Sequence, residues 1–292
     1  MEKPAVQVGV LVLLGALWGS SFLLIKKALL YFLPWEAALI RIVISACVLV
    51  PLVTRHLRNF SMRDLSWLVI TGLFGNGIPA FLWALAQQGL DSSFGGLINA
   101  TTPLFTLGVS AVFFKKIPRR FAWMGLGLGT CGAVLFFVLA RRWAGPGQFS
   151  AFHAALGLAG AACYGVSLNL IRHRLQHVHP LSITGVPFVF MGAVSFMTLM
   201  AFSQPWQWPQ KPGVHHGLLY LTLLGVFATG FGVWLFNRLL KHTSALFASS
   251  VTYLIPVFAM FFSFLAGEPF HVFLIPVLVL ILSGIFLIQK SG

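Results

Sequence analysis

The residues best suited to binding chemistry are uncharged polar side chains inside long apolar runs, at two matching places in the chain. They precede a proline in both cases: Asn99 and Thr102 before Pro103, and Thr252 and Tyr253 before Pro256. Amides and hydroxyls can hold an organic solute by hydrogen bonds without preventing its release. The alternative, hydrogen bonding between helices worth about 0.6 kcal/mol each, stays open.

The prolines themselves add a second signal. A proline inside a helix removes a backbone hydrogen bond and kinks the helix, and interrupted helices at equivalent places in two repeats point to a binding site near the membrane midplane. Pro103 and Pro256 fit this pattern, as do the stretch GNGIP, which holds Asn76 and Pro79, and the stretch TGFG, which begins at Thr229. We therefore expect kinks or gates here, with a tolerated kink that has no ligand role as the alternative.

Aromatic residues mark the middle of two further apolar runs. Trp18 and Tyr164 are expected to face one another across the repeat and to wall a cavity, because membrane aromatics normally gather at the interfaces instead. Ser21 and Ser167 follow three residues later on the same helical faces and can donate hydrogen bonds to a solute. Trp83 is a further candidate for this wall. Plain helix packing remains the other interpretation.

Charged groups are few inside the apolar runs. Arg41 is the basic residue that lies well inside one, and an intramembrane charge is by default a functional hypothesis. It stands near the outer end of its run, however, so a side chain that snorkels to the interface is the favoured interpretation. The acids all lie at a terminus or at the edge of a run: Glu2, Glu36, Asp64, Asp91 and Glu268.

The absence of a deep carboxylate or histidine predicts a facilitator or exchanger of uncharged or zwitterionic solutes. Proton-coupled carriers usually keep such a group within the membrane. The alternative is a coupling proton carried by Glu268, Glu36 or a histidine at the edge of a run.

The composition explains why these polar groups must lie in a membrane. Of the 292 residues, 58% are hydrophobic and 8% are charged, and the mean hydropathy is +0.91, whereas soluble domains carry about 25% charged residues. The basic residues gather at the ends of apolar runs, which argues against nucleic acid as a partner; we expect membrane lipid and a small-molecule solute.

The three cysteines lie in apolar runs without paired spacing, so neither a disulfide nor a metal site nor a cofactor is predicted. Gly127, Gly129 and Gly132 spell GxGxxG inside an apolar run with no strand before it, which favours helix packing over dinucleotide binding.

Ten apolar runs are long enough to cross a bilayer, which takes about 20 helical residues. They cover roughly 8–32, 36–54, 67–86, 94–114, 121–140, 151–171, 181–203, 216–237, 246–266 and 271–288. Thirteen of the 19 basic residues fall on the side of the N-terminus, and five fall on the other: Lys26, Lys27, Arg141, Arg142 and Lys211. This bias predicts that both termini and the segment 115–120 face the cytoplasm, in a multi-pass protein of the inner (plasma) membrane.

Internal repetition divides the chain. An offset of 146 residues places Trp18 on Tyr164 and Lys26 on Arg172, and an offset of 153 places Asn76 on Thr229, Pro103 on Pro256 and Lys115 on Glu268. Five runs per half is an odd number, so the two halves must have opposite orientations in the membrane. We predict an all-α integral membrane protein with two inverted five-helix repeats, 1–143 and 144–292, around a central cavity.

At this level the chain resembles the ten-helix EamA-type branch of the drug/metabolite transporter superfamily. The resemblance is carried by LLGALWGSSF in the first run, by Pro34 followed by Arg41, and by the NATTPLFTLGVSAVFFKK and SSVTYLIPVFAMFFSFLAGEPF stretches, and it covers the whole chain. It implies export of amino acids or other small metabolites by alternating access. One departure is Lys115, where an acidic residue often ends the fourth run, whereas Glu268 is kept.

Two other functions compete with a secondary transporter. A channel would favour a clear polar stripe or an oligomeric ring, and neither is evident. An intramembrane enzyme needs a nucleophile with its base, or carboxylates with a metal, and the acids at the run edges do not supply them. The sequence leaves the substrate, the driving ion and the oligomeric state open.

Overall fold

The computed structural model describes residues 4–53, 60–114, 120–242 and 251–290. These residues form helices and no strand, and they include eight apolar helices long enough to cross a membrane and two shorter apolar ones. The predicted ten-span, all-α architecture is therefore confirmed. The beginning of the ninth span, predicted from residue 246, lies outside the described residues up to 250.

Within the described residues, three of the spans consist of more than one helix. The first half contains α1 (Pro4–Ala28), α2 (Pro34–Val53), α3 (Met62–Gly72) with η2 (Leu73–Gly77) and α4 (Ile78–Ala86), α5 (Ser92–Asn99) with α6 (Thr102–Phe113), and α7 (Arg120–Trp143). The second half contains α8 (Ala151–Arg174), α9 (Pro180–Phe202), the short η3 (Pro205–Gln210), α10 (Val214–Leu223) with η4 (Leu224–Phe231) and α11 (Gly232–His242), α13 (Val251–Leu265), and α14 (Leu274–Lys290).

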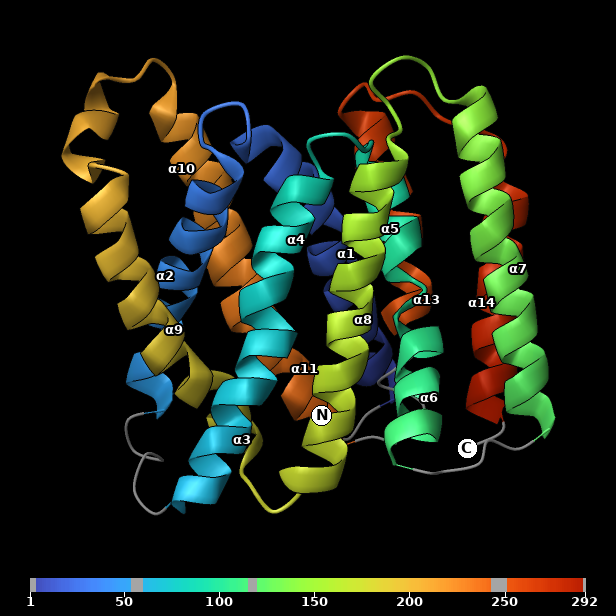
Figure 1. Ribbon diagram of the computed structural model, residues 1–292, viewed down its shortest axis with the longest axis horizontal. Helices are drawn as coiled ribbons and strands as arrows, with labels where there is room; N and C mark the ends of the chain where they lie inside the picture. The colour runs from blue at the N-terminus through green and yellow to red at the C-terminus, as the bar shows by residue number, and fades with distance from the viewer. Residues whose placement is uncertain (1–3, 54–59, 115–119, 243–250, 291–292) are drawn as a thin grey trace.

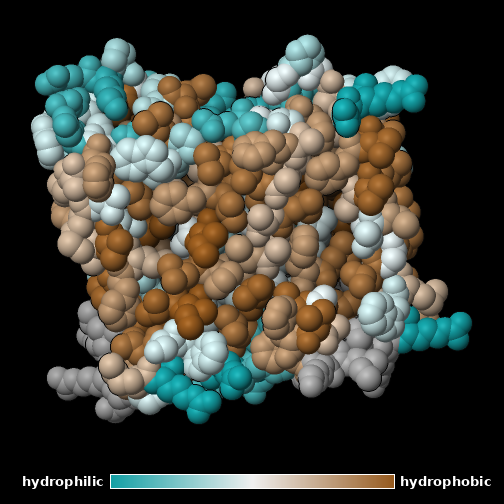
Figure 2. Space-filling model, viewed as in Figure 1, coloured by the Kyte–Doolittle hydropathy of each residue, from teal (hydrophilic) through white to brown (hydrophobic). Residues whose placement is uncertain are grey.

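On the side shown in Figure 2, a broad apolar band lies between two polar ends. Large apolar side chains such as Val138, Val194 and Phe264 are more than half exposed. Exposed apolar surface on this scale needs lipid as its solvent, because soluble proteins rarely expose such large contiguous patches. The polar ends mark where the helices leave the membrane.

The two halves are interlocked. α1 packs against α13 and against the α10–η4–α11 span of the other half, and α8 packs in the same way against α6 and the α3–η2–α4 span. The equivalent helices α2 and α9 form one pair, and α7 and α14 form another at the opposite side of the molecule (Figure 1). Each half therefore buries its helices against the other.

Both described chain ends lie on one face of the molecule, here the termini face (Figure 1). On the opposite face, here the Lys26 face, helices α1, α4 and α13 end, and the helices that follow them, α2, α5 and α14, begin. This placement agrees with an even number of spans.

π-helical turns interrupt the third and eighth spans at equivalent places. The N–H of Ile78 bonds to the carbonyl of Leu73, and the N–H of Gly232 bonds to that of Phe227, five residues back in each case. Such turns widen the helix and are frequent at functional sites. The glycine- and proline-containing stretches singled out in the sequence thus become real irregularities, with Pro79 in the first turn of α4.

The fourth span is broken just before Pro103. Proline lacks an N–H, so the carbonyl four residues earlier, on Asn99, loses its helical partner. The Thr102 hydroxyl donates to that carbonyl at 2.8 Å, and the Thr101 hydroxyl donates to the carbonyl of Ile98 at 2.6 Å. Pro256 differs, because it lies inside the continuous helix α13.

Small residues let the outer pair of helices approach closely. A methyl group added at Gly284 of α14 would lie 2.6 Å from backbone atoms of Gly125 and Gly129 in α7. Gly129 and Gly132 also lie directly against side chains of Leu104 and Ile281. Two of the three glycines of the GxGxxG sequence therefore serve helix packing, as predicted.

Candidate functional site

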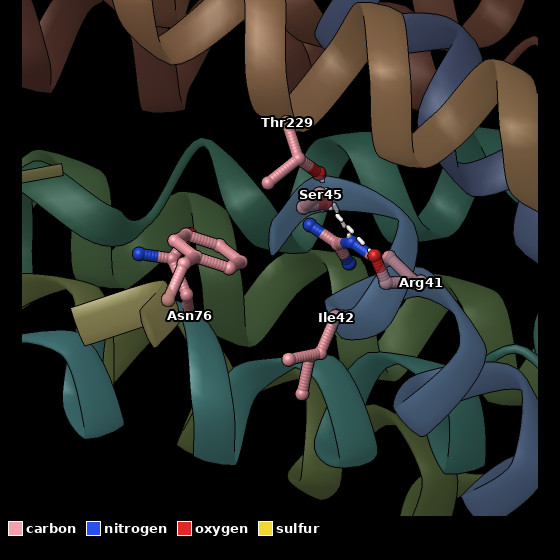
Figure 3. Close-up of a pocket in the computed structure, with 6 residues that line it drawn as sticks. Arg41, Ile42, Ser45, Asn76 and Thr229 are labelled. Carbon is pink, nitrogen blue, oxygen red and sulfur yellow. Dashed lines mark hydrogen bonds between the residues drawn. The ribbon is translucent and has the colours of Figure 1, made fainter. Parts of the chain in front are cut away.

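A small polar pocket lies among helices of both halves (Figure 3). The packed side chains leave no room in it for a water molecule, so the predicted central cavity is closed as packed. Arg41, Ile42 and Ser45 line it from α2, Asn76 from η2, Phe188 from α9 and Thr229 from η4. The two π-helical turns thus each contribute one polar side chain to the same space.

Arg41 dominates the pocket chemically. It is the eighth residue of α2, about 10 Å along the helix from the Lys26 face, yet its Nε donates to Thr229 Oγ1 at 3.2 Å. Thr229 lies about 22 Å along the eighth span from the same face. The guanidinium therefore points towards the interior, and the favoured interpretation that Arg41 snorkels to the interface is wrong.

No carboxylate balances Arg41 in the part of the chain that the structure describes. The ion pairs there involve Lys26, His177 and His271 as the cations. The polar neighbours of the guanidinium are the Thr229 hydroxyl and the Tyr164 hydroxyl of α8. Arg41 is thus a permanent positive charge within the membrane, surrounded by neutral groups.

The π-helical turns also offer backbone carbonyls to neighbouring helices. The Ser45 hydroxyl donates to Gly225 O at 3.1 Å, and the Trp18 indole N–H donates to Ala228 O at 2.9 Å. In α3, just before the other π-helical turn, the carbonyl of Thr71 accepts a hydrogen bond from the Ser167 hydroxyl at 2.9 Å. Each half thereby anchors its first helix to the interrupted span of the other half.

Trp18 and Tyr164 do not face one another as predicted. The Trp18 ring packs on Phe236 of α11 with 5.3 Å between ring centroids, whereas Tyr164 interacts with Arg41 and with the Trp83 indole. The reason is that the first helix of each half, α1 or α8, packs against the third span of the opposite half. Tyr164 and Trp83 are brought to the Arg41 region, and Trp18 lies behind η4.

The remaining predicted residues have more local partners. The Ser21 hydroxyl donates to Leu17 O of its own helix at 3.0 Å, and Trp83 is fully buried with its edge on Phe22. Asn99 and Thr102 flank the break before α6 and pair through hydroxyl and carbonyl. Thr252 and Tyr253 are partly exposed on α13; none of these residues lines the Arg41 pocket.

An ionic network joins the two halves at the Lys26 face, and the sequence did not reveal it. Lys26 Nζ lies 2.8 Å from Asp91 Oδ1 and 2.8 Å from Glu268 Oε1. Glu268 also accepts hydrogen bonds from the backbone N–H and hydroxyl of Ser92 and from the hydroxyl of Ser263. His271 Nε2 lies 3.6 Å from Asp91 Oδ2. The network joins α1 and α5 of the first half to the α13–α14 connection of the second.

The charge of Glu268 is stabilised in this network. Burial raises the pKa of Glu268. The hydrogen bonds from Lys26 and Ser263 and the charge of Lys26 lower the pKa by more than burial raises it, so the pKa of Glu268 lies below its usual value. The carboxylate is therefore ionised in the closed arrangement. Because the partners are distant in sequence, only the positions of Lys26, Asp91 and Glu268 at run edges hinted at the network.

No group of three or more side chains able to hold a metal ion occurs among the described residues. The chemistry available at the Arg41 pocket is thus reversible binding by charge, hydrogen bonds and apolar contact.

Comparisons with known proteins identify relatives that are named as transporters. The model of the EamA-like transporter family matches twice, at residues 7–138 and 151–289. The chain is 25% identical to an uncharacterised transporter of Synechocystis over 86% of this chain and 80% of that protein. It is 26% identical to an S-adenosylmethionine/S-adenosylhomocysteine transporter of Chlamydia trachomatis over 92% and 85%. It is 23% identical to an inner membrane transporter of Escherichia coli over 86% and 80%.

A solved structure shares the fold. A protein crystal structure superposes with a TM-score of 0.63 at 19% sequence identity, over 98% of this chain and 96% of the other. At this identity the similarity concerns the fold alone.

Proposed function

This chain belongs to the EamA-like transporter family, and from this premise we propose that it carries small organic solutes by alternating access through the Arg41 pocket. Relatives over most of its length are named as transporters, so it is a membrane transporter and not an enzyme.

The observation that carries the proposal is a polar pocket between two interlocked halves that are also joined by an ion pair at the Lys26 face. Arg41 and Asn76 come from the first half, and Phe188 and Thr229 come from the second. Lys26 joins the first half to Glu268 of the second. A rocking motion of one half against the other would break that pair and open the pocket to the Lys26 face. The pocket is too small for a solute as packed, which is what a closed stage of such a cycle requires.

We place both termini and the segment 115–120 in the cytoplasm, as the charge bias favours; residues 115–119 lie outside the described part of the chain. Gln210 and Gln176 are exposed near opposite faces. An impermeant thiol reagent should label Gln210→Cys in intact cells and should leave Gln176→Cys unlabelled until the cells are opened. The reverse pattern would overturn this orientation.

We further propose export or exchange of metabolites such as amino acids down their gradients, with the repeats divided between residues 143 and 144. The S-adenosylmethionine/S-adenosylhomocysteine transporter among the relatives fits solutes that carry an amino-acid group. Gating is assigned to the irregular regions at Pro79, Pro103 and Pro256. The described polar groups of the spans include no carboxylate near the pocket, which supports a facilitator over a proton-driven carrier.

The decisive test is transport by the purified full chain in proteoliposomes. A carrier shows saturation and counterflow for its solutes, whereas a channel-like pore gives flux that rises linearly and shows no counterflow. Trp18→Ala and Tyr164→Ala should each lower the rate or the affinity while the protein still inserts and purifies. Unchanged rate and affinity in both variants would mean that the site is misplaced.

A further inference from the structure

The Arg41 pocket contains a charge without a counter-ion. A cation in the membrane is costly unless it is paired or hydrated, and arginine stays protonated under all ordinary conditions. Arg41 has a threonine hydroxyl and a tyrosine hydroxyl as its polar neighbours, and no ion pair among the described residues. Something outside this set of residues must balance the charge when the pocket is filled.

The geometry leaves most of the guanidinium available. An arginine side chain has five N–H donors in a planar fork. In this structure Nε is directed to Thr229 Oγ1 at 3.2 Å, and the side chain also hydrogen-bonds to the Tyr164 hydroxyl. Arg41 is only partly buried and lines the pocket (Figure 3). The two terminal nitrogens therefore have donors left for an acceptor inside the pocket.

The other residues that line the pocket indicate which kind of solute could bind to Arg41. Asn76 adds a neutral amide, and Ile42 and Phe188 add apolar surface. The fork of an arginine matches the two oxygens of a carboxylate. A single carboxylate also neutralises a single arginine, whereas a doubly charged phosphate would bring excess negative charge into a pocket with one cation.

We infer that Arg41 is the counter-ion for a solute carboxylate, and that the protein selects small monocarboxylates, zwitterions included, with an apolar remainder. The inference rests on the proposed transport function and narrows its substrate class by excluding uncharged solutes. The carboxylate sits on the guanidinium with Asn76 beside it, and the apolar remainder contacts Ile42 and Phe188. Binding of a monocarboxylate anion neutralises the pocket, whereas a zwitterion pairs its carboxylate with Arg41 and keeps its own ammonium charge.

The test uses purified full-length protein and a matched pair of probes, 4-methylpentanoate and its amide 4-methylpentanamide. The carboxylate should bind and stabilise the protein against thermal unfolding, and the amide should bind at least about tenfold more weakly, because charge-assisted hydrogen bonds are lost. Arg41→Gln should remove this preference. Arg238→Gln is the matched control: Arg238 is exposed on α11 and contacts Trp234 outside the pocket, so the preference should persist there.

Arg41→Lys is a second variant in case Arg41→Gln does not fold. It keeps the positive charge and lacks the planar guanidinium. It should retain a weakened preference for the carboxylate. An equal preference in the wild type and in Arg41→Gln, or equal binding of acid and amide by the wild type, would overturn the inference. Counterflow of uncharged amides and polyols alone would overturn it and leave the transport function standing. A lack of counterflow for every solute, with the Arg41-dependent preference intact, would instead refute the carrier function.

Discussion

Lys26 and Arg41 are both cations on membrane helices, and their surroundings are opposite. Lys26 reaches two carboxylates from other elements, each at 2.8 Å. Arg41 has hydroxyls as its neighbours and a pocket in front of it. A charge whose partners are all supplied by the protein serves to hold the protein closed. A charge whose partner is missing is available to a ligand.

The same contrast separates the two faces of the molecule. The repeat places Lys26 on Arg172 and Glu268 on Lys115, so the termini face has basic residues where the Lys26 face has an ion pair. Lys115 lies outside the described residues, and the comparison there is one of sequence. The inverted repeat therefore places charged residues of different sign at equivalent positions near the two faces.

The largest effect is expected from Lys26→Met. The change leaves Asp91 and Glu268, whose side chains are 4% and 11% exposed, without their shared cation. Breaking a buried pair costs about 3–5 kcal/mol, and because the Lys26 side chain is 33% exposed we expect about 2 kcal/mol for the closed state. Thermal unfolding and labelling from the Lys26 face would measure it. The triple variant with Asp91→Asn and Glu268→Gln should recover part of the loss, and no recovery would argue against a charge effect.

Acidification of the Lys26 face should open it through Glu268. Because the pKa of Glu268 is lowered when the network is closed, the ionised carboxylate stabilises closure above its usual pKa. That stabilisation is lost as the pH falls through the lowered value. Lys26, Ser92 and Ser263 face Glu268, and Asp91 and His271 belong to the same network.

A thiol-labelling rate measured against pH would test this, with His271→Asn separating the histidine from the glutamate. The acid-dependent step should be absent in Glu268→Gln. An identical step in that variant would assign the pH dependence to another group.

A charge reversal at the other face should sharpen the comparison. Lys115→Glu places an acid at the repeat position of Glu268, opposite Arg172 in the repeat register. An exposed or half-exposed pair is worth up to about 1 kcal/mol, so closure of the termini face should gain by up to about fivefold. Lys116→Glu is a control with the same charge change at a neighbouring position. Equal effects of both variants on transport would point to net charge and not to the repeat.

The smallest effects are expected where the halves are joined by single hydrogen bonds. Ser167→Ala removes the bond to Thr71 O, and Trp18→Phe removes the bond to Ala228 O. Each should reduce stability by about 0.6 kcal/mol, the average found for side-chain hydrogen bonds between membrane helices. Thermal unfolding of the two single variants and the double variant would show whether the anchors are equivalent.

The fold was largely predictable, and the site was predictable in part. Apolar length gives the spans, and the GNGIP and TGFG stretches indicated the π-helical turns that carry Asn76 and Thr229. The prediction that Trp18 and Tyr164 face one another was wrong. The repeat shows which positions are equivalent, but it does not show which helices of the other half each position packs against. Arg41 was undervalued, because distance along a helix does not give the direction of a long side chain. The Lys26 network joins residues far apart in sequence, which no local pattern reveals.

The most direct test of the account is the labelling rate of Asn76→Cys in intact cells, with Cys47, Cys131 and Cys163 replaced. An impermeant thiol reagent added outside reports access to the Arg41 pocket from the Lys26 face. The account predicts slow labelling, an increase of about tenfold or more with Lys26→Met, and a slower rate with 4-methylpentanoate but not with its amide. A labelling rate that depends neither on Lys26 nor on the carboxylate would contradict it.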